Sequence, residues 1–383
     1  MFGFGRKDGV APEAKASATG RVVAWGAAGR SVWSARDTGT LTRTGFTGNP
    51  VGFRAVKLIA EAAAAVPIVC GDGVARFDLH PVIDLMRRPN GAQGGSEWFE
   101  ALFGQLLLSG DAYVEAVGGV GLPVELHVLR SDRMSVVPGT DGWPIAYDYA
   151  VGGRKHRFKV GDVSPVCHVR SFHPQDDHYG LSPMQAAANA VDVHNAASLW
   201  SKGLLDNAAR PSGAIVHGGE AELSPEQFER LSAELEANHQ GARNAGRPML
   251  LEGGLDWKPM GFSPSDMEFQ KTKEAAAREI ATAFGVPPMM LGIPGDATYA
   301  NYVEANRAFY RLTVLPLVGK VCEALSYWLG QHSGQTLRIE ADRDRVPALQ
   351  AERDAEWVRI AGADFLTADE KRRMLGLPPL DAV

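Results

Sequence analysis

Residues 263–309 read SPSDMEFQKTKEAAAREIATAFGVPPMMLGIPGDATYANYVEANRAF and are the most informative part of this chain. Ser263 followed by proline is a typical helix start, with the hydroxyl at the N-cap and the proline in the first turn. About twenty helical residues follow. Gly285 and the prolines at 287 and 288 end that helix, and a loop rich in Gly, Pro and Asp leads to a longer helix from about Tyr302. No catalytic signature accompanies this pattern.

The composition is that of a folded protein with more than one packed unit. With 383 residues, 45% of them hydrophobic and 22% charged, we expect two to four units. No apolar run reaches the ~18 residues of a membrane span, so we expect no membrane partner. The first residues lack the apolar core of a secretory signal, and the three cysteines suit a reducing cytoplasm.

The net charge of −6 argues against a protein that grips DNA tightly. Proteins that hold duplex DNA through its phosphates usually carry a basic face and a high pI. If DNA is the partner, the sequence therefore predicts a loose, sliding contact.

The first half of the chain is typical of an α+β fold. Residues 1–45 are rich in Gly, Ala, Ser, Thr and Arg without a clear period, which indicates a flexible arm. A helix is expected from Asn49 and Pro50, and a second over 98–109. Short strands then alternate with turns: ELHVLR, MSVVP, AYDYAV, HRFKV and CHVR.

Several of these segments resemble the portal proteins of tailed phages, in the order in which that family has them. They cover roughly residues 50–325. One departure is Asp111, where the family usually has Asn. The segments that carry the resemblance are AVKLIAEAAAAVPI, HPVIDLMRRPN, LLLSGDAYVEAV, HVRSFHPQDDHYGLSPMQAA, NAARPSGAI, NAGRPMLLEGGLDWKPMGFSPSD and the 263–309 stretch.

The resemblance implies an α+β portal-protein fold with an α/β wing, long stem helices, a small α/β clip and a helical C-terminal crown. The divisions that it implies are a flexible N-terminal arm (1–45), the wing (46–181), a stem helix (182–207), the clip (208–262), a second stem helix (263–285), a tunnel loop (286–301), a wing helix kinked at Pro316 (302–334) and the crown (335–383).

The resemblance also implies a function. Portal proteins form a ring of about twelve subunits at one capsid vertex, closed by heterologous contacts. Double-stranded DNA passes through the ring during packaging and ejection. The implied partners are further copies of the chain, the terminase large subunit, a head–tail adaptor and the major capsid protein. The implied location is the portal vertex of a virion assembled in the host bacterial cytoplasm. Phage, prophage and gene transfer agent remain open as its source.

Two groups of residues are candidates for contacts with partners. In the tunnel loop, Thr298, Tyr299 and Asn301 could reach phosphates or sugars through neutral hydrogen bonds, although the segment could also be a plain helix connection. In the clip, the acidic helix could dock a partner or could simply be a solvated face. The clip candidates are Glu222, Glu226, Glu229, Arg243 and Asn244.

The sequence predicts no enzyme, and we assign no catalytic, cofactor-binding or metal-binding residue. A P-loop is absent from the sequence. The densest set of possible metal ligands has spacings that favour a structural loop. A metal-dependent nuclease and a monomeric head–tail adaptor or scaffold protein are the alternatives. The possible ligands are His168, His173, His178, Asp176 and Asp177.

Overall fold

The structure is a computed structural model. It describes residues 33–73, 76–77, 79–118, 121–206, 213–217, 224, 226–227, 229–230, 233, 255–259, 265–295, 299–377 and 380. Residues Ser34–Val383 form one compact unit.

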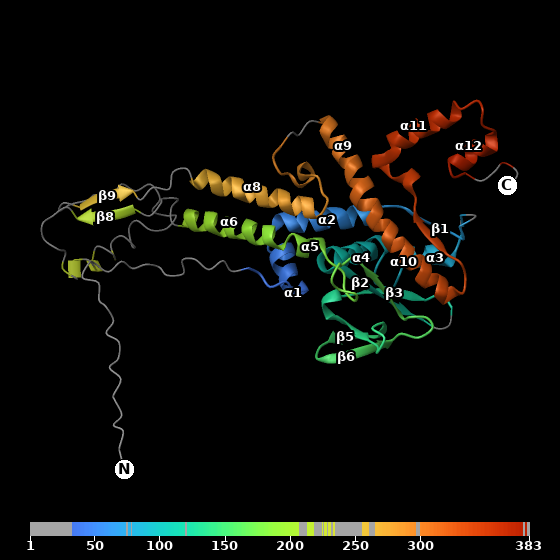
Figure 1. Cartoon of the computed structure of the whole chain (residues 1–383), viewed down its shortest axis with the longest axis horizontal. Helices are drawn as coiled ribbons and strands as arrows, with labels where there is room; N and C mark the ends of the chain where they lie inside the picture. The colour runs from blue at the N-terminus through green and yellow to red at the C-terminus, as the bar shows by residue number, and fades with distance from the viewer. Residues whose placement is uncertain are drawn as a thin grey trace, which may run out of the picture. The chain divides into compact units, whose positions relative to one another are not determined.

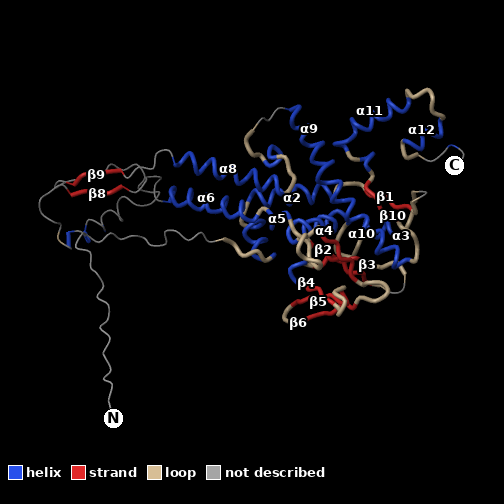
Figure 2. The backbone as a smooth tube through the Cα atoms, viewed as in Figure 1, coloured by secondary structure: helices blue, strands red, loops and turns tan. Residues whose placement is uncertain are grey.

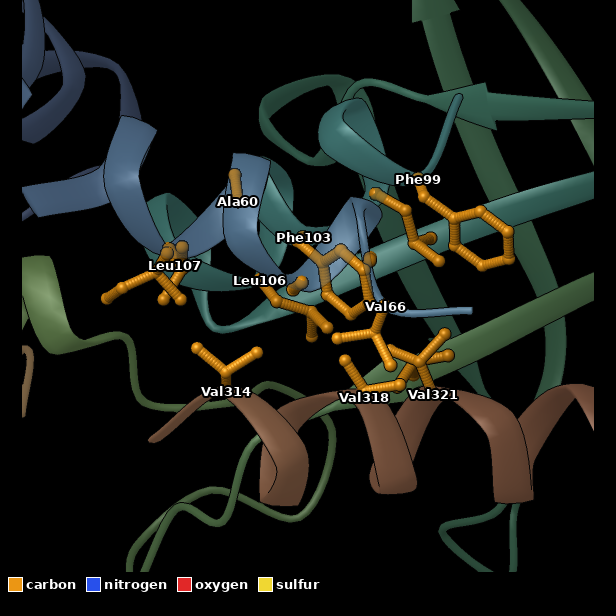
Figure 3. Close-up of a cluster of buried hydrophobic side chains, with 14 of the residues drawn as sticks. Ala60, Val66, Phe99, Phe103, Leu106, Leu107, Val314, Val318 and Val321 are labelled. Carbon is orange, nitrogen blue, oxygen red and sulfur yellow. The ribbon is translucent and has the colours of Figure 1, made fainter. Parts of the chain in front are cut away.

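Two helices in close contact organise the main core. Helix α2 (Pro50–Ala64) begins where expected, because the Asn49 side chain accepts hydrogen bonds from the first-turn amides and Pro50 has no amide to satisfy. Its apolar face packs on α4 (Gly95–Ser109), and both helices lie against α10 (Leu315–Ser333). In Figure 3, Phe103 and Leu106 lie on the side toward Val314, Val318 and Val321 in this core.

Two small antiparallel sheets follow α4. The first has the order β3-β2-β7 and the second the order β4-β5-β6, with a separate core that includes Tyr113, Tyr147 and Phe158. Figure 2 shows β4, β5 and β6 grouped together. The strands are β2 (Asp111–Val117), β3 (Glu125–Leu129), β4 (Met134–Pro138), β5 (Pro144–Val151), β6 (Arg154–Lys159) and β7 (Val166–Arg170).

A third pairing joins distant parts of the chain. Strand β1 (Ile68–Gly71) pairs with β10 (Arg338–Ala341), and the short helix α3 (Pro81–Arg87) lies nearby. The division expected at residue 335 therefore assigns the two strands of this sheet to different units, β1 to the wing and β10 to the crown. Helices α11 (Gln350–Ala361) and α12 (Ala368–Met374) follow β10 in the chain, and Thr367 and Glu370 form a capping box at the start of α12.

The last residues of the segment predicted as a flexible arm (1–45) have helical structure. Helix α1 (Thr38–Leu41) and a π-helical segment (Thr42–Thr47) precede α2, and Leu41 is buried in the main core. Ser34 donates from its amide and its hydroxyl to Asp192. These contacts order a segment whose sequence shows no periodicity, which is why sequence analysis missed it.

Helices lie at both positions predicted for stem helices, with small differences in their bounds. Residues 182–207 give α5 (Pro183–Ala186) and, after a break at Ala187, α6 (Ala188–Asp206). Residues 263–285 give α8 (Ser265–Ala283). Figure 1 shows α6 and α8 running side by side. Between them in the sequence, β8 (Gly213–His217) pairs with β9 (Leu255–Pro259).

The long helix expected from Tyr302 begins three residues earlier and changes its winding midway. Helix α9 (Tyr299–Phe309) leads through a π-helical turn (Tyr310–Val314) into α10, with Pro316 in the first turn of α10. The wider turn suits a proline that lacks an amide hydrogen. Within the described part of the chain, residues 300–333 form one helix with the length and apolar composition of a membrane span. Its apolar side lies in the main core.

Candidate channel segment and docking surfaces

The helix pair α6 and α8 is held together along one side of each helix. Near one end, the rings of Trp200 and Phe269 stack with their centroids 3.9 Å apart. Toward the other end, small and apolar residues of α8 such as Ala276 and Ile280 are buried. The side of α8 that carries these residues thus faces inward, and small buried residues of α6, such as Ala190 and Ala197, allow close packing. Other positions, such as Leu199 and Arg278, remain exposed.

A buried histidine fixes the start of this helix pair against α2. Asn49 uses its side-chain oxygen to cap α2, so its amide nitrogen is directed to Nδ1 of His194 at 3.1 Å. Nδ1 must then be an unprotonated acceptor. Burial lowers the pKa of His194, and the positive charge of Lys273 lowers it further. The site therefore favours the neutral ring.

The end of α8 is fixed by a close contact with the π-helical turn. Gly285 has φ +65°, and a Cβ at this position would lie 2.8 Å from Oγ1 of Thr313. That hydroxyl donates a hydrogen bond of 2.6 Å to the Gly285 carbonyl. Glycine is therefore required both by the left-handed backbone and by the space available.

The segment predicted as a tunnel loop (286–301) is more structured than expected. A 3₁₀ turn spans Pro288–Leu291, and Ile293 packs on Ala277 and Ala281 of α8. The side chain of Arg278 donates to the Pro294 carbonyl. The chain thus folds back on α8 as far as residue 295. The one hint of this contact in the sequence is the apolar residue Ile293 after Gly292. The surrounding Gly and Pro residues indicate a loop, so the contact with α8 was not predicted.

The three candidate residues of this segment are placed only in part. Thr298 lies outside the described residues. Tyr299 begins α9, and Asn301 is an exposed residue in the first turn of the same helix. Tyr302 is also exposed, to 49%, so the start of α9 presents polar and aromatic groups to its surroundings. Figure 1 shows α9 extending beyond the helices of the core.

The clip candidates are also placed only in part. Glu226 and Glu229 are exposed and helical. Glu222, Arg243 and Asn244 lie outside the described residues.

Two of the candidate metal ligands, His168 and Asp176, make structural contacts instead. Nε2 of His168 lies 2.8 Å from Asp111, and the Gly180 amide donates to both oxygens of the same carboxylate. The Asp176 side chain accepts from the amides of His178 and Tyr179, and the first of these bonds is the main reason that its pKa is lowered. Among the described residues, no group of three or more His, Cys, Asp or Glu side chains is arranged to hold a metal ion.

Asp111 was missed as a structural residue because its partners are distant in sequence. Its side chain ties β2 to His168 on β7 and to the segment that leads into α5. Buried carboxylates require such partners, because an unpaired one would be costly. Asp111 accepts hydrogen bonds with both of its carboxylate oxygens, whereas an asparagine has only one acceptor oxygen. The aspartate at this position thus has a structural role.

Comparisons with known proteins agree on one family. The family model described as phage portal protein matches residues 50–376. The portal protein of Enterobacteria phage HK97 is 26% identical over 344 residues, covering 86% of this chain and 78% of that protein. An uncharacterised protein of Rickettsia bellii (strain RML369-C) is 40% identical over 341 residues, 87% of each chain.

A solved structure is more similar still. A chain in the neck of the native gene transfer agent particle, computed with C12 symmetry, is 68% identical. The match covers 92% of this chain and 97% of that chain, with a TM-score of 0.72.

Proposed function

Since this chain belongs to the phage portal protein family, we propose that about twelve copies form a closed ring at one vertex of a capsid. The observation that carries the proposal is the 68% identity, over nearly the whole chain, to a neck chain in a particle computed with C12 symmetry. That identity, against 26% to the HK97 portal protein, favours a gene transfer agent particle as the assembly.

Native mass spectrometry of the purified protein tests the ring. We expect one dominant species of about twelve chains, because heterologous contacts at the correct rotation leave no free face. A protein that stays monomeric at micromolar concentration and inside assembled particles would instead support the adaptor or scaffold alternative.

We also propose that duplex DNA passes through the centre of the ring and meets the segment between α8 and α9. The supporting observation is that the start of α9 is exposed, whereas residues up to 295 are held on α8. Thr298, Tyr299 and Asn301 would offer neutral hydrogen bonds to phosphates and sugars, which position DNA without reading its sequence.

Replacement of residues 296–298 by glycine and serine tests this role. The ring should still assemble, because Ile293 and Arg278 secure the preceding residues to α8. DNA packaging, measured as nuclease-protected DNA per particle, should fall. The same replacement of Ala363 and Asp364, in the turn between α11 and α12, is the matched control and should leave packaging unchanged. Normal packaging in the 296–298 variant would contradict the assignment.

The remaining partners follow from the same proposal. The arm (1–45), the wing (46–181) and the crown (335–383) would sit at the capsid, with the major capsid protein around them. The clip (208–262) would dock the terminase large subunit during packaging and the head–tail adaptor afterwards. Glu226 and Glu229 are exposed, as a docking surface requires. We propose no catalytic activity, because the chemistry of packaging would belong to the terminase.

A further inference from the structure

Strand β6 concentrates positive charge in a chain that is acidic overall. Its sequence from residue 154 to 159 is RKHRFK, and the chain carries a net charge of −6. All five basic side chains of the strand are exposed, and only Phe158 is buried. No acidic residue interrupts the run, so β6 forms a local cationic surface.

Strand β6 is also an edge strand with unused backbone groups. The sheet order is β4-β5-β6, and no described strand lies beyond β6 (Figure 1). The Val160 amide donates to the Ile145 carbonyl. Because hydrogen-bonded pairs alternate in an antiparallel ladder, residues 154, 156 and 158 bond to β5 and residues 155, 157 and 159 face the open edge. The tight Gly152-Gly153 turn, with both residues at positive φ, fixes this register.

The charges on the outer face of the sheet are not equivalent. Asp148 on β5 is largely buried and accepts two hydrogen bonds from Arg157, at 2.6 and 2.7 Å. This pair draws Arg157 back over the sheet. The hydrogen bonds from Arg157 lower the pKa of Asp148, and the charge of Lys155 contributes further to this lowering. Within the described structure, the side chains of Lys155 and Lys159 form no hydrogen bond or ion pair. Lys155 and Lys159, four residues apart on the same face of β6, therefore lie beside the open edge and can contact a partner.

Exposed apolar residues border the cationic strand at both ends. Trp143 is 72% exposed and Ile145 is 53% exposed, beside Val160. At the hairpin end, Val151 is 45% exposed opposite Arg154. Because side chains alternate along a strand, Ile145, Val151 and Val160 lie on the face of Phe158, opposite to that of Lys155 and Lys159. A polypeptide can bury such apolar side chains, whereas phosphates would gain nothing from them.

We propose that β6 binds an extended acidic segment of a partner protein, which adds to the sheet as a fourth strand. The backbone groups of residues 155, 157 and 159 would supply the hydrogen bonds. Carboxylates directly opposite Lys155 and Lys159 would form cross-strand pairs on the outer face. A second copy of β6 cannot be the occupant, because like charges would lie opposite each other.

The assembled full-length protein can be tested with a simple probe. A fluorescein-labelled eight-residue peptide of alternating Glu and Thr should bind at low salt, as measured by fluorescence anisotropy. The double variant Lys155→Glu/Lys159→Glu should weaken this binding by about ten-fold or more. A matched control, Lys320→Glu/Arg343→Glu, reverses two exposed cations elsewhere and should change it by less than about two-fold.

A second pair of variants tests the backbone contact. Lys155→Pro and Lys155→Ala lose the same charge, but only proline removes an amide that faces the open edge. The β5–β6 ladder stays complete in both, and circular dichroism checks the fold. Binding should fall further in the proline variant.

Two results would overturn the proposal. One is unchanged peptide binding in the Lys155→Glu/Lys159→Glu variant. The other concerns a DNA duplex of about 20 base pairs. If this duplex displaces the peptide, and if its own affinity falls as much as the peptide's in the Lys155→Glu/Lys159→Glu variant, then β6 binds nucleic acid instead.

Discussion

Gly285 shows at the scale of one residue how the end of α8 is determined. Alanine there would adopt an unfavourable left-handed backbone and would place its Cβ 2.8 Å from the Thr313 hydroxyl. We expect Gly285→Ala to lower the free energy of unfolding by about 2–3 kcal/mol, measured by urea denaturation.

Gly292 provides the matched control for that experiment. It has φ +72°, but an added Cβ would meet no heavy atom within 4 Å. Gly292→Ala should therefore cost only the backbone part, about 1 kcal/mol. Equal losses in the two variants would show that the contact with Thr313 contributes nothing.

His194 predicts a pH dependence of stability. Its folded-state pKa lies below the ordinary value of 6.5, so the unfolded chain binds the proton more readily. The stability that the neutral His194 ring contributes is then fully present above pH 6.5, and it is lost as the pH falls from there toward the folded-state pKa. We expect the free energy of unfolding to decline over this window, and to decline less in His194→Gln. His332, whose pKa burial also lowers, should leave a residual slope in that variant. A slope unchanged from the wild type would contradict the account.

At the scale of elements, the contact between Trp200 and Phe269 should couple α6 to α8. A double-mutant cycle with Trp200→Ala and Phe269→Ala isolates their interaction from the separate losses of buried area. We expect a coupling of about 1 kcal/mol from thermal unfolding, as for other stacked aromatic pairs. Additive effects would mean that the two helices are held only by the small residues nearer the core.

The helices with regular caps and apolar periods were predictable from sequence. Asn49 caps a helix where the sequence pattern predicts one, and Ser182 and Thr367 cap helices by the same kind of side-chain bond. The break at Ala187 and the π-helical turn at Tyr310–Val314 were not predictable, because neither leaves a local composition signal.

The candidate sites could be predicted only in part, because they depend on contacts between segments that are distant in sequence. The pairing of β1 with β10 and the bond between Asp111 and His168 join residues far apart in sequence. Local patterns could show that His168 and Asp176 lie near one another in the chain. They could not show that His168 instead forms a hydrogen bond with the buried carboxylate of Asp111, 57 residues upstream.

At the scale of the whole molecule, net charge predicts how the ring meets DNA. Each chain contributes −6, so a ring of such chains is acidic as a whole. We expect the isolated ring to bind duplex DNA weakly, and to lose that binding as salt rises. A filter-binding titration between about 50 and 200 mM salt measures this. Tight binding that persists at high salt would contradict a sliding contact.

The most direct measurement is electron microscopy of the purified protein viewed along the symmetry axis. We predict closed rings of about twelve subunits around an open centre, as in the neck chain computed with C12 symmetry. Single subunits, or open chains of subunits without closure, would contradict the central claim that this protein forms a portal.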